Sequence, residues 1–285
     1  MSYQPPPAPP PQPPQPPGPP PEPQRAAAGV RPTPVPVVTY TLLAVNTAML
    51  LLETVLSHDG AGGLLSPSTP ALCQLGALNA AAIVQSGQYW RLLTVMVLHA
   101  GIIHWAFNSW ALYLFGPLLE RLLGRVRFLA LYVGAGLVGS AASLLFTHTD
   151  LGVGASGAIF GLLGALVAFS FRRRRDPRIQ ALFRNLLFIL IFNLYLGFRV
   201  IHVDNSAHIG GFLGGLAAMA LFETIPVRPR PEARFATDPG RRRPGSGSLE
   251  ARDLALAVPF LACLLLTAVA VATFPATPAF SCAGI

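Results

Sequence analysis

A serine and a histidine stand at the beginnings of two apolar stretches of helical length. Ser156 lies in GVGASGAIFG (152–161), and His208 lies in SAHIGGFLGG (206–215). A serine hydroxyl is a weak nucleophile until a neighbouring base takes its proton, and a neutral imidazole is the usual base near pH 7. If the two side chains meet, they make a nucleophile and a general base suited to attack on a carbonyl carbon.

Such a reaction also needs hydrogen-bond donors for the oxyanion of the tetrahedral intermediate. His104 and Asn108 are four residues apart in a third apolar stretch, so both point the same way from a helix. The N–H of Ser156 is a further donor, because the first N–H groups of a helix have no partner within it.

Each of these residues also has a structural interpretation. A serine in a membrane helix can bond the carbonyl one turn earlier, and small residues let helices pack. Asp204 is either a third catalytic residue or, like its neighbours Asn205 and Ser206, a candidate helix cap. Two stripes of small residues favour the catalytic pair, because they let the backbones that carry Ser156 and His208 approach closely. The stripes are Gly157, Gly161 and Ala165, and Ala207, Gly211 and Gly215.

The elements that position these residues must be membrane helices. The 285 residues are 52% hydrophobic and 11% charged, with a mean hydropathy of +0.53, whereas soluble domains carry roughly 25% charged residues. We predict an all-α, polytopic membrane helix bundle with about seven transmembrane helices, since apolar runs near the ~20 residues that cross a bilayer recur along the chain. The runs are 37–56, 103–122, 126–147, 156–171, 181–201, 206–225 and 253–274.

The arginines predict the orientation of this bundle. Basic residues near the ends of spans stay on the cytoplasmic side, and with a cytoplasmic N-terminus every arginine except Arg91 and Arg199 falls in an inner segment. The net charge of +8 is thus a topology signal and predicts no nucleic-acid partner. We expect a multi-pass protein of the cell membrane whose reactive residues face the extracytoplasmic side. All six histidines fall at that side: His58, His99, His104, His148, His202 and His208.

Three motifs in register carry a resemblance to a known family. They are YWRLLTVMVLHAGIIHWAFNSWALYLFGPLLERLLG (89–124), GASGAIFG (154–161) and SAHIGGFLGG (206–215). The chain from about 37 to 225 resembles the rhomboid family of intramembrane serine proteases, in the bacterial form with one helix added to a six-helix core. The resemblance implies Ser156 as nucleophile and His208 as general base and acid. It implies His104, Asn108 and the Ser156 amide as the oxyanion hole.

Other positions match the family in supporting roles. Phe160 matches an aromatic ring that packs against the catalytic histidine, and Trp90 and Arg91 match a pair expected to anchor a long outer loop, 57–102, in the membrane interface. Glu120, beside Arg121, is expected to tie the inner loop together. The supporting glycines are Gly154, Gly157 and Gly211.

The chain divides into four predicted parts. Residues 1–36 are a proline-rich, disordered cytoplasmic tail, which is either a tether or a ligand for a proline-reading partner. Residues 37–225 are the catalytic core, and 226–252 are a basic cytoplasmic loop. Residues 253–285 are an added transmembrane helix and a short outer tail. No cleavable signal peptide is visible at the N-terminus.

No cofactor or metal is expected. Cys73, Cys263 and Cys282 fit no metal spacing; Cys73 and Cys282 fall on one side of the membrane and are either a disulfide or two free thiols. A metalloprotease is disfavoured, because HExxH is missing and no carboxylate stands beside the histidines within the spans.

The predicted function is cleavage of transmembrane segments of single-span or multispan membrane proteins near the outer face of the bilayer. A channel or transporter is the main alternative, but it predicts charges near the midplane or an internal repeat, and neither is found in the sequence. An inactive membrane scaffold of the same family is the other alternative, although such a relative would lack the serine or the histidine.

Overall fold

The computed structural model describes residues 35–57, 63–147, 151–201, 203–224, 257–273 and 282. Contacts divide the chain into Met1–Pro34, which lies outside the described residues, and Val35–Ile285. Most of the predicted tail and the whole predicted loop 226–252 therefore lie outside them, as do His58, His148 and His202. The division into four parts stays a prediction.

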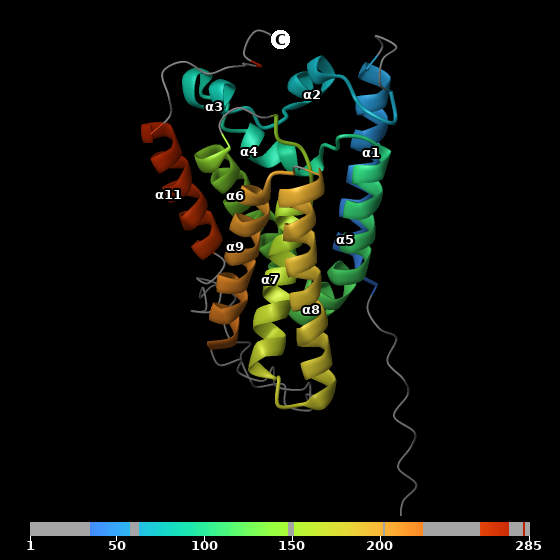
Figure 1. The fold of residues 1–285 in the computed structure, drawn as a ribbon, viewed down its shortest axis with the longest axis vertical. Helices are drawn as coiled ribbons and strands as arrows, with labels where there is room; N and C mark the ends of the chain where they lie inside the picture. Colours follow the sequence, from blue (N-terminus) through green and yellow to red (C-terminus); the bar gives the residue numbers. More distant parts are fainter. Residues whose placement is uncertain are drawn as a thin grey trace, which may run out of the picture. The chain divides into compact units, whose positions relative to one another are not determined.

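In the described part of the second unit, all of the regular elements are helices, as predicted, and the described part of each predicted apolar run is helical (Figure 1). The long helices are α1 (Val37–Leu56), α5 (Ile102–Leu123), α6 (Arg125–Phe146), α7 (Ser156–Arg172), α8 (Pro177–Leu196), α9 (Asn205–Thr224) and α11 (Ala257–Thr273). A π-helical turn, Gly197–Ile201, continues α8.

Among the described residues, three helices are long and apolar enough to cross a membrane: α1, α6, and α8 with its extension to Arg199. A fourth candidate is α5 taken together with Arg91–Val97, from which it is bent by 91°. The chain is thus a polytopic helix bundle, while the crossing of the membrane by the other long helices stays a prediction.

Helix α7 lies between α8 and α9 and forms the centre of the core (Figure 1). Every residue from Gly157 to Ala168 is buried. The two stripes of small residues meet here, because a Cβ added at Gly211 would strike the carbonyl oxygen of Gly157, and one at Gly215 would strike that of Gly161. The close approach of α7 and α9 agrees with the prediction from sequence and brings together the helix starts that carry Ser156 and His208.

Glu120 joins two distant helix ends. Its carboxylate, at the end of α5, accepts hydrogen bonds from the Val38 N–H (3.0 Å), the Thr39 N–H (2.8 Å) and the Thr39 hydroxyl (2.8 Å). The cap position of α1 is Pro36, which provides no side-chain bond. The carboxylate therefore accepts hydrogen bonds from the first N–H groups of α1. It also lies at the positive end of the α1 dipole, where a negative charge is favourable.

The described part of the segment between α1 and α5 contains several short helices and lies at one end of the bundle (Figure 1). It contains α2 (Thr69–Leu75), α3 (Ala80–Ser86), α4 (Arg91–Thr94) and a 3₁₀ turn, Val95–Val97. Trp90 is 48% exposed, as suits an interfacial residue, but Arg91 is only 3% exposed. Its guanidinium donates to the carbonyls of Cys73 and Ala77, both at 2.9 Å. The prediction of Arg91 as an interfacial anchor is wrong, because these two backbone acceptors hold its charge inside the loop.

Candidate active site

Ser156 is the first residue of α7 and follows a loop with unusual backbone geometry. Gly154 has φ of 132°, a conformation that residues with a Cβ rarely adopt. Its N–H donates to the Val95 carbonyl at 2.9 Å, which anchors the loop two residues before the serine. No side chain caps α7, so the Ser156 N–H belongs to the group of helix-start donors without a partner in their own helix.

Ser156 and His208 are in hydrogen-bond contact. The Ser156 Oγ lies 3.0 Å from His208 Nε2. On the other edge of the ring, His208 Nδ1 lies 3.3 Å from the Oδ1 of Asn205, whose Nδ2 donates to the Leu194 carbonyl at 3.3 Å. The bond from Asn205 Nδ2 to the Leu194 carbonyl leaves the Asn205 Oδ1 facing His208. An oxygen accepts hydrogen bonds, so the ring proton belongs on Nδ1 and the lone pair of Nε2 faces the serine. This is the tautomer that a general base requires.

Phe160 fixes the plane of the same imidazole. Its ring stacks on that of His208 with centroids 4.1 Å apart and an interplanar angle of 4°. Phe160 is one turn after Ser156 on α7, so one helix carries both the partner of Nε2 and the surface against which the ring lies. The predicted contact between this aromatic ring and the histidine is present.

His104 borders the same site from α5. Its Nδ1 accepts the Ala100 N–H at 3.2 Å, which leaves the proton of a neutral ring on Nε2. A Cβ added at Gly154 would lie 3.0 Å from His104 Nε2 and 3.5 Å from Ser156 Oγ. The Nε2 of His104 and the Oγ of Ser156 are therefore both close to the position that a Cβ of residue 154 would occupy. Glycine has no Cβ, so this position stays empty.

Asn108 lies one turn further along α5 and is buried. Its Nδ2 has no hydrogen-bond partner among the described residues. Buried side-chain donors are nearly always bonded, so an orphaned donor requires an explanation. A transient anionic oxygen at the site would provide the missing acceptor.

Asp204 is a helix cap. Its Oδ1 accepts from the Ser206 N–H (3.0 Å), the Ala207 N–H (3.1 Å) and the Thr147 hydroxyl (3.2 Å). Of the two interpretations of Asp204, the structure supports the cap. The neighbour that contacts the imidazole is Asn205, which the sequence singled out only as a candidate cap; its spacing of three residues from His208 was the available signal.

His99 is fully buried, and its ring centroid is 5.6 Å from that of His104. The N–H of His99 donates to the Glu53 carboxylate of α1 at 2.9 Å. Tertiary packing thus brings Glu53 from a different helix to the backbone of His99, which lies in the loop outside the predicted spans. Even so, the described residues contain no group of three or more His, Cys, Asp or Glu side chains placed to hold a metal ion.

The remaining supporting residues have structural contacts. Trp90 and Arg91 belong to the segment between α1 and α5, and Glu120 contacts the first turn of α1. Gly157 and Gly211 contribute by allowing α7 and α9 to touch.

Known proteins share this sequence pattern. The rhomboid domain family matches residues 86–224. The rhomboid protease GluP of Bacillus subtilis (strain 168) is 41% identical over 197 residues, which cover 69% of this chain and 37% of that protein. RHOMBOID-like protein 6, mitochondrial, of Arabidopsis thaliana is 42% identical over 153 residues, which cover 53% of this chain and 49% of that protein. The chain thus spans less than half the length of either relative.

A shorter relative is matched over most of its length. The putative rhomboid protease YdcA of Bacillus subtilis (strain 168) is 35% identical over 181 residues, which cover 63% of this chain and 85% of that protein. With the domain match, and with Ser156 and His208 in contact inside the matched region, this similarity shows that the chain belongs to the rhomboid protease family.

Proposed function

We propose that this chain is an intramembrane serine endopeptidase with a catalytic dyad of Ser156 and His208. The observation that carries the proposal is the 3.0 Å contact between Ser156 Oγ and His208 Nε2, together with the Asn205 bond that directs the Nε2 lone pair to the hydroxyl. A dyad with this tautomer can deprotonate the serine as it attacks a carbonyl carbon.

The reaction has two halves. His208 takes the proton of Ser156 while Oγ bonds to the scissile carbonyl, and the oxyanion is stabilised by the Nε2–H of His104, the Nδ2–H of Asn108 and the Ser156 N–H. His208 then gives the proton to the leaving amine, and an acyl-enzyme remains. Water, deprotonated by His208, hydrolyses this ester and releases Ser156.

The proposed substrates are single-span or multispan membrane proteins, cut in or beside a transmembrane segment. The glycines around the dyad leave space for a peptide backbone more than for bulky side chains, which favours small residues at the cut site. A substrate helix must also unwind to expose its scissile bond, so residues that weaken helices, such as Gly, Pro and Ser, are favoured nearby.

The proposed site faces the extracytoplasmic side of the cell membrane. Ser156 lies at the start of α7, whereas the arginines Arg172–Arg175 lie at its other end, and basic residues are retained in the cytoplasm. A disulfide between Cys73 and Cys282 lies at the same end as the loop before Ser156, and disulfides persist in oxidising compartments. Two independent signals therefore favour this orientation.

The alternatives from other classes lack comparable support. A channel or transporter requires no contact between Ser156 and His208, and an inactive relative would have lost one of them. Binding of a proline-reading partner by the N-terminal tail stays a prediction, because residues 1–34 lie outside the described residues.

Cleavage of a single-span reporter in reconstituted membranes tests the proposal. We expect the native chain to cut near the outer end of the reporter, and we expect Ser156→Ala and His208→Ala to reduce the rate by at least ~1,000-fold, since dyad members act as a unit. Ser170→Ala is the matched control, because this serine on the same helix bonds only carbonyls of α7. Cleavage by the Ser156 variant at the native rate would refute the assignment.

A second measurement covers the case in which the reporter is a poor substrate. An activated serine reacts with a fluorophosphonate, and we expect the label at Ser156 of the native chain and no label in His208→Ala. A native chain that neither cuts nor reacts would leave the scaffold as the better interpretation.

A further inference from the structure

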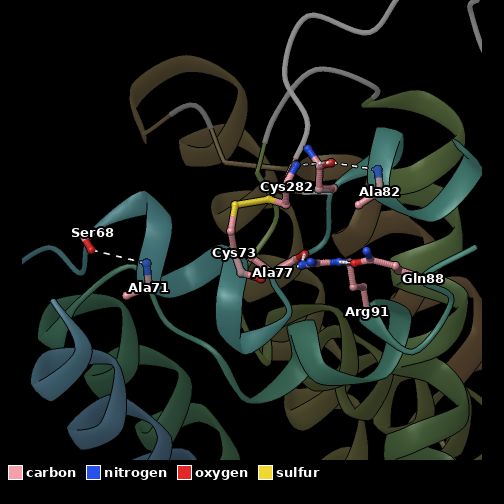
Figure 2. Close-up of a disulfide and its surroundings, with 9 residues drawn as sticks. Ser68, Ala71, Cys73, Ala77, Ala82, Gln88, Arg91 and Cys282 are labelled. Atoms are coloured by element: carbon pink, nitrogen blue, oxygen red, sulfur yellow. Dashed lines mark hydrogen bonds between the residues drawn. A yellow bond between two sulfur atoms is a disulfide. The ribbon is translucent and has the colours of Figure 1, made fainter. Parts of the chain in front are cut away.

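A disulfide joins two segments at opposite ends of the described chain. Cys73 of α2 and Cys282 are bonded across a sequence separation of 209 residues, with Cα atoms 5.4 Å apart (Figure 2). The two side chains are 1% and 2% exposed. The covalent ring that this bond closes contains both Ser156 and His208.

Both cysteines are also held by hydrogen bonds from the segment between α1 and α5. The Cys73 carbonyl accepts from the buried Arg91 guanidinium at 2.9 Å, and the same nitrogen donates to the Ala77 carbonyl (Figure 2). The Cys282 N–H donates to the Asn79 Oδ1 at 3.2 Å, and this oxygen also caps α3 through the Ala82 N–H. We call the stretch from Cys73 to Ala82, with Arg91, the disulfide platform.

The disulfide platform is paired with the loop that leads to the nucleophile. Leu78 and Gly152 form an antiparallel bridge, each N–H donating to the other's carbonyl at 2.9 Å. Leu151 packs against the cluster formed by Cys73, Ala82 and Cys282. Gly152 is only four residues before Ser156, so the disulfide platform borders the backbone whose course places the serine.

The loop before Ser156 has few other attachments among the described residues. Gly154 is bonded to Val95 at 2.9 Å, and Val95 follows α4 directly, which begins with Arg91. Arg91 in turn holds the carbonyls of Cys73 and Ala77. Both hydrogen-bonded attachments of the loop therefore lead back to the disulfide platform, while the side chain of Val153 packs against the cluster of Leu72, Ala77 and Leu98.

We propose that the Cys73–Cys282 disulfide is a positioning element for Ser156, and that its opening lowers the reactivity of the serine without removing the fold. The proposal rests on the proposed function, since it assigns regulation to the same site. In the closed form, the disulfide platform holds Leu151 and Gly152 and keeps Oγ in line with His208. In the open form, the bridge between Leu78 and Gly152 loosens, and Ser156 samples positions away from the base.

The switch is a two-electron exchange. Closing removes two protons and two electrons from the thiols of Cys73 and Cys282, and a disulfide-carrying thiol oxidoreductase or a small-molecule disulfide accepts them. Opening is the reverse reaction with a dithiol reductant, whose thiolate attacks one sulfur of the bond; its second thiol then resolves the mixed disulfide, and both cysteines are released as thiols.

The test compares the full-length native chain with Cys73→Ser/Cys282→Ser, in detergent or membranes and below both melting temperatures. Cys263→Ser is the matched control, because Cys263 is the free buried cysteine of α11. Peptide mass spectrometry without reductant establishes the bond. Hydrogen exchange of the Gly152 amide reports the bridge to Leu78, and the rate of fluorophosphonate labelling reports the serine; kcat and KM are measured on the reporter.

We expect the double variant, and the native chain in which a dithiol has reduced the Cys73–Cys282 bond, to exchange the Gly152 amide at least tenfold faster. We expect labelling and kcat to fall by about tenfold with KM unchanged, since small misplacements of reacting groups cost up to ~100-fold in rate. The double variant should no longer respond to the dithiol, and Cys263→Ser should match the native chain in every measurement.

Several results would overturn the inference. They are absence of the linked peptide from the native chain, unchanged Gly152 exchange in the double variant, or faster exchange with unchanged labelling and kcat. The last result, with a lower melting temperature, would make the disulfide a structural bond only. If the oxidised native chain is neither labelled nor active, the proposed function fails, and Gly152 exchange still decides whether the disulfide holds this loop.

Discussion

At the scale of single residues, the imidazole of His208 is held on three sides. Ser156 contacts Nε2, Asn205 contacts Nδ1, and Phe160 covers one face of the ring. A neutral histidine can adopt either tautomer, so the acceptor at Nδ1 decides which nitrogen is basic. Asn205 thus has the position that a carboxylate occupies in a catalytic triad, but with a neutral side chain.

Replacing Asn205 with alanine tests this role. We expect kcat to fall by about tenfold or more with little change in KM, because general-base catalysis contributes ~10²–10⁴-fold and depends on the orientation of the base. Asn205→Asp, which keeps an oxygen for Nδ1, should retain more activity than Asn205→Ala. Steady-state kinetics on the reporter measures both values.

Asn193→Ala is the matched control for this prediction. Asn193 is exposed on α8, and its amide bonds only a carbonyl of the same helix. The orientation role fails if Asn205→Ala changes KM alone, or if Asn205→Asp is as inactive as the alanine variant.

Gly154 provides a second test at the residue scale. A methyl group there would lie 2.8 Å from His104 Cε1, on a backbone with φ of +132°. We expect Gly154→Ala to lower kcat by about 100-fold, because the methyl group displaces His104 or the serine. Reporter cleavage, with the melting temperature as a measure of folding, checks this outcome.

Gly87→Ala separates backbone strain from crowding. Gly87 also has positive φ, +68°, but a Cβ there meets no atom within 4 Å. We expect this variant to cost ~1–2 kcal/mol of stability and to leave kcat unchanged. Equal losses of activity in the two variants would mean that strain, and not contact with His104, explains the effect of Gly154→Ala.

At the scale of elements, α7 and α9 touch through glycines and thereby bring two helix starts together. The close packing of Gly157 with Gly211 and of Gly161 with Gly215 leaves no space for side chains between the backbones. Helix association in a membrane relies on such packing, because lipid provides no hydrophobic drive between helices.

The contact between α5 and α1 is of a different kind. Glu120→Ala leaves the N–H groups of Val38 and Thr39 without their carboxylate acceptor. We expect a loss of about 3 kcal/mol in the free energy of unfolding, typical of bonds to a charged group, while kcat of the folded enzyme stays unchanged. Denaturant unfolding in detergent and reporter kinetics measure the two quantities.

The neighbouring Arg121→Ala is the control for Glu120→Ala, because Arg121 is exposed at the same helix end. If Glu120→Ala reduced kcat as much as it reduced stability, Glu120 would have an influence on the site that its contacts with α1 do not explain.

At the scale of the whole molecule, the described part of Val35–Ile285 is connected between distant segments by helix packing and by one disulfide. Helix α11 packs on α6, where Cys263 contacts Val138 and Ala141, and Cys282 is bonded to Cys73 of α2. The disulfide therefore links α2 to the chain beyond α11, and the covalent ring that it closes includes the residues of α7 and α9. A protein with this architecture can couple the redox state of its compartment to an internal site.

The sequence by itself determined the all-helical class, the places of the long helices and the pairing of Ser156 with His208. These follow from local signals, because hydropathy sets the helices and small residues at four-residue spacing mark helices that approach closely. The rhomboid motifs added the predicted roles of His104, Asn108 and Phe160.

Only the tertiary structure decided which partners these residues have. Asn205 contacts His208 whereas Asp204 caps α9, because adjacent residues at the start of this helix point in different directions. Arg91 turned inward to backbone carbonyls, and Glu53 reached His99 from another helix. Cys73 and Cys282, an open choice in the sequence, became a disulfide because packing brings their Cα atoms within 5.4 Å. Such contacts depend on how far apart different elements lie, and the sequence pattern within one element does not predict that distance.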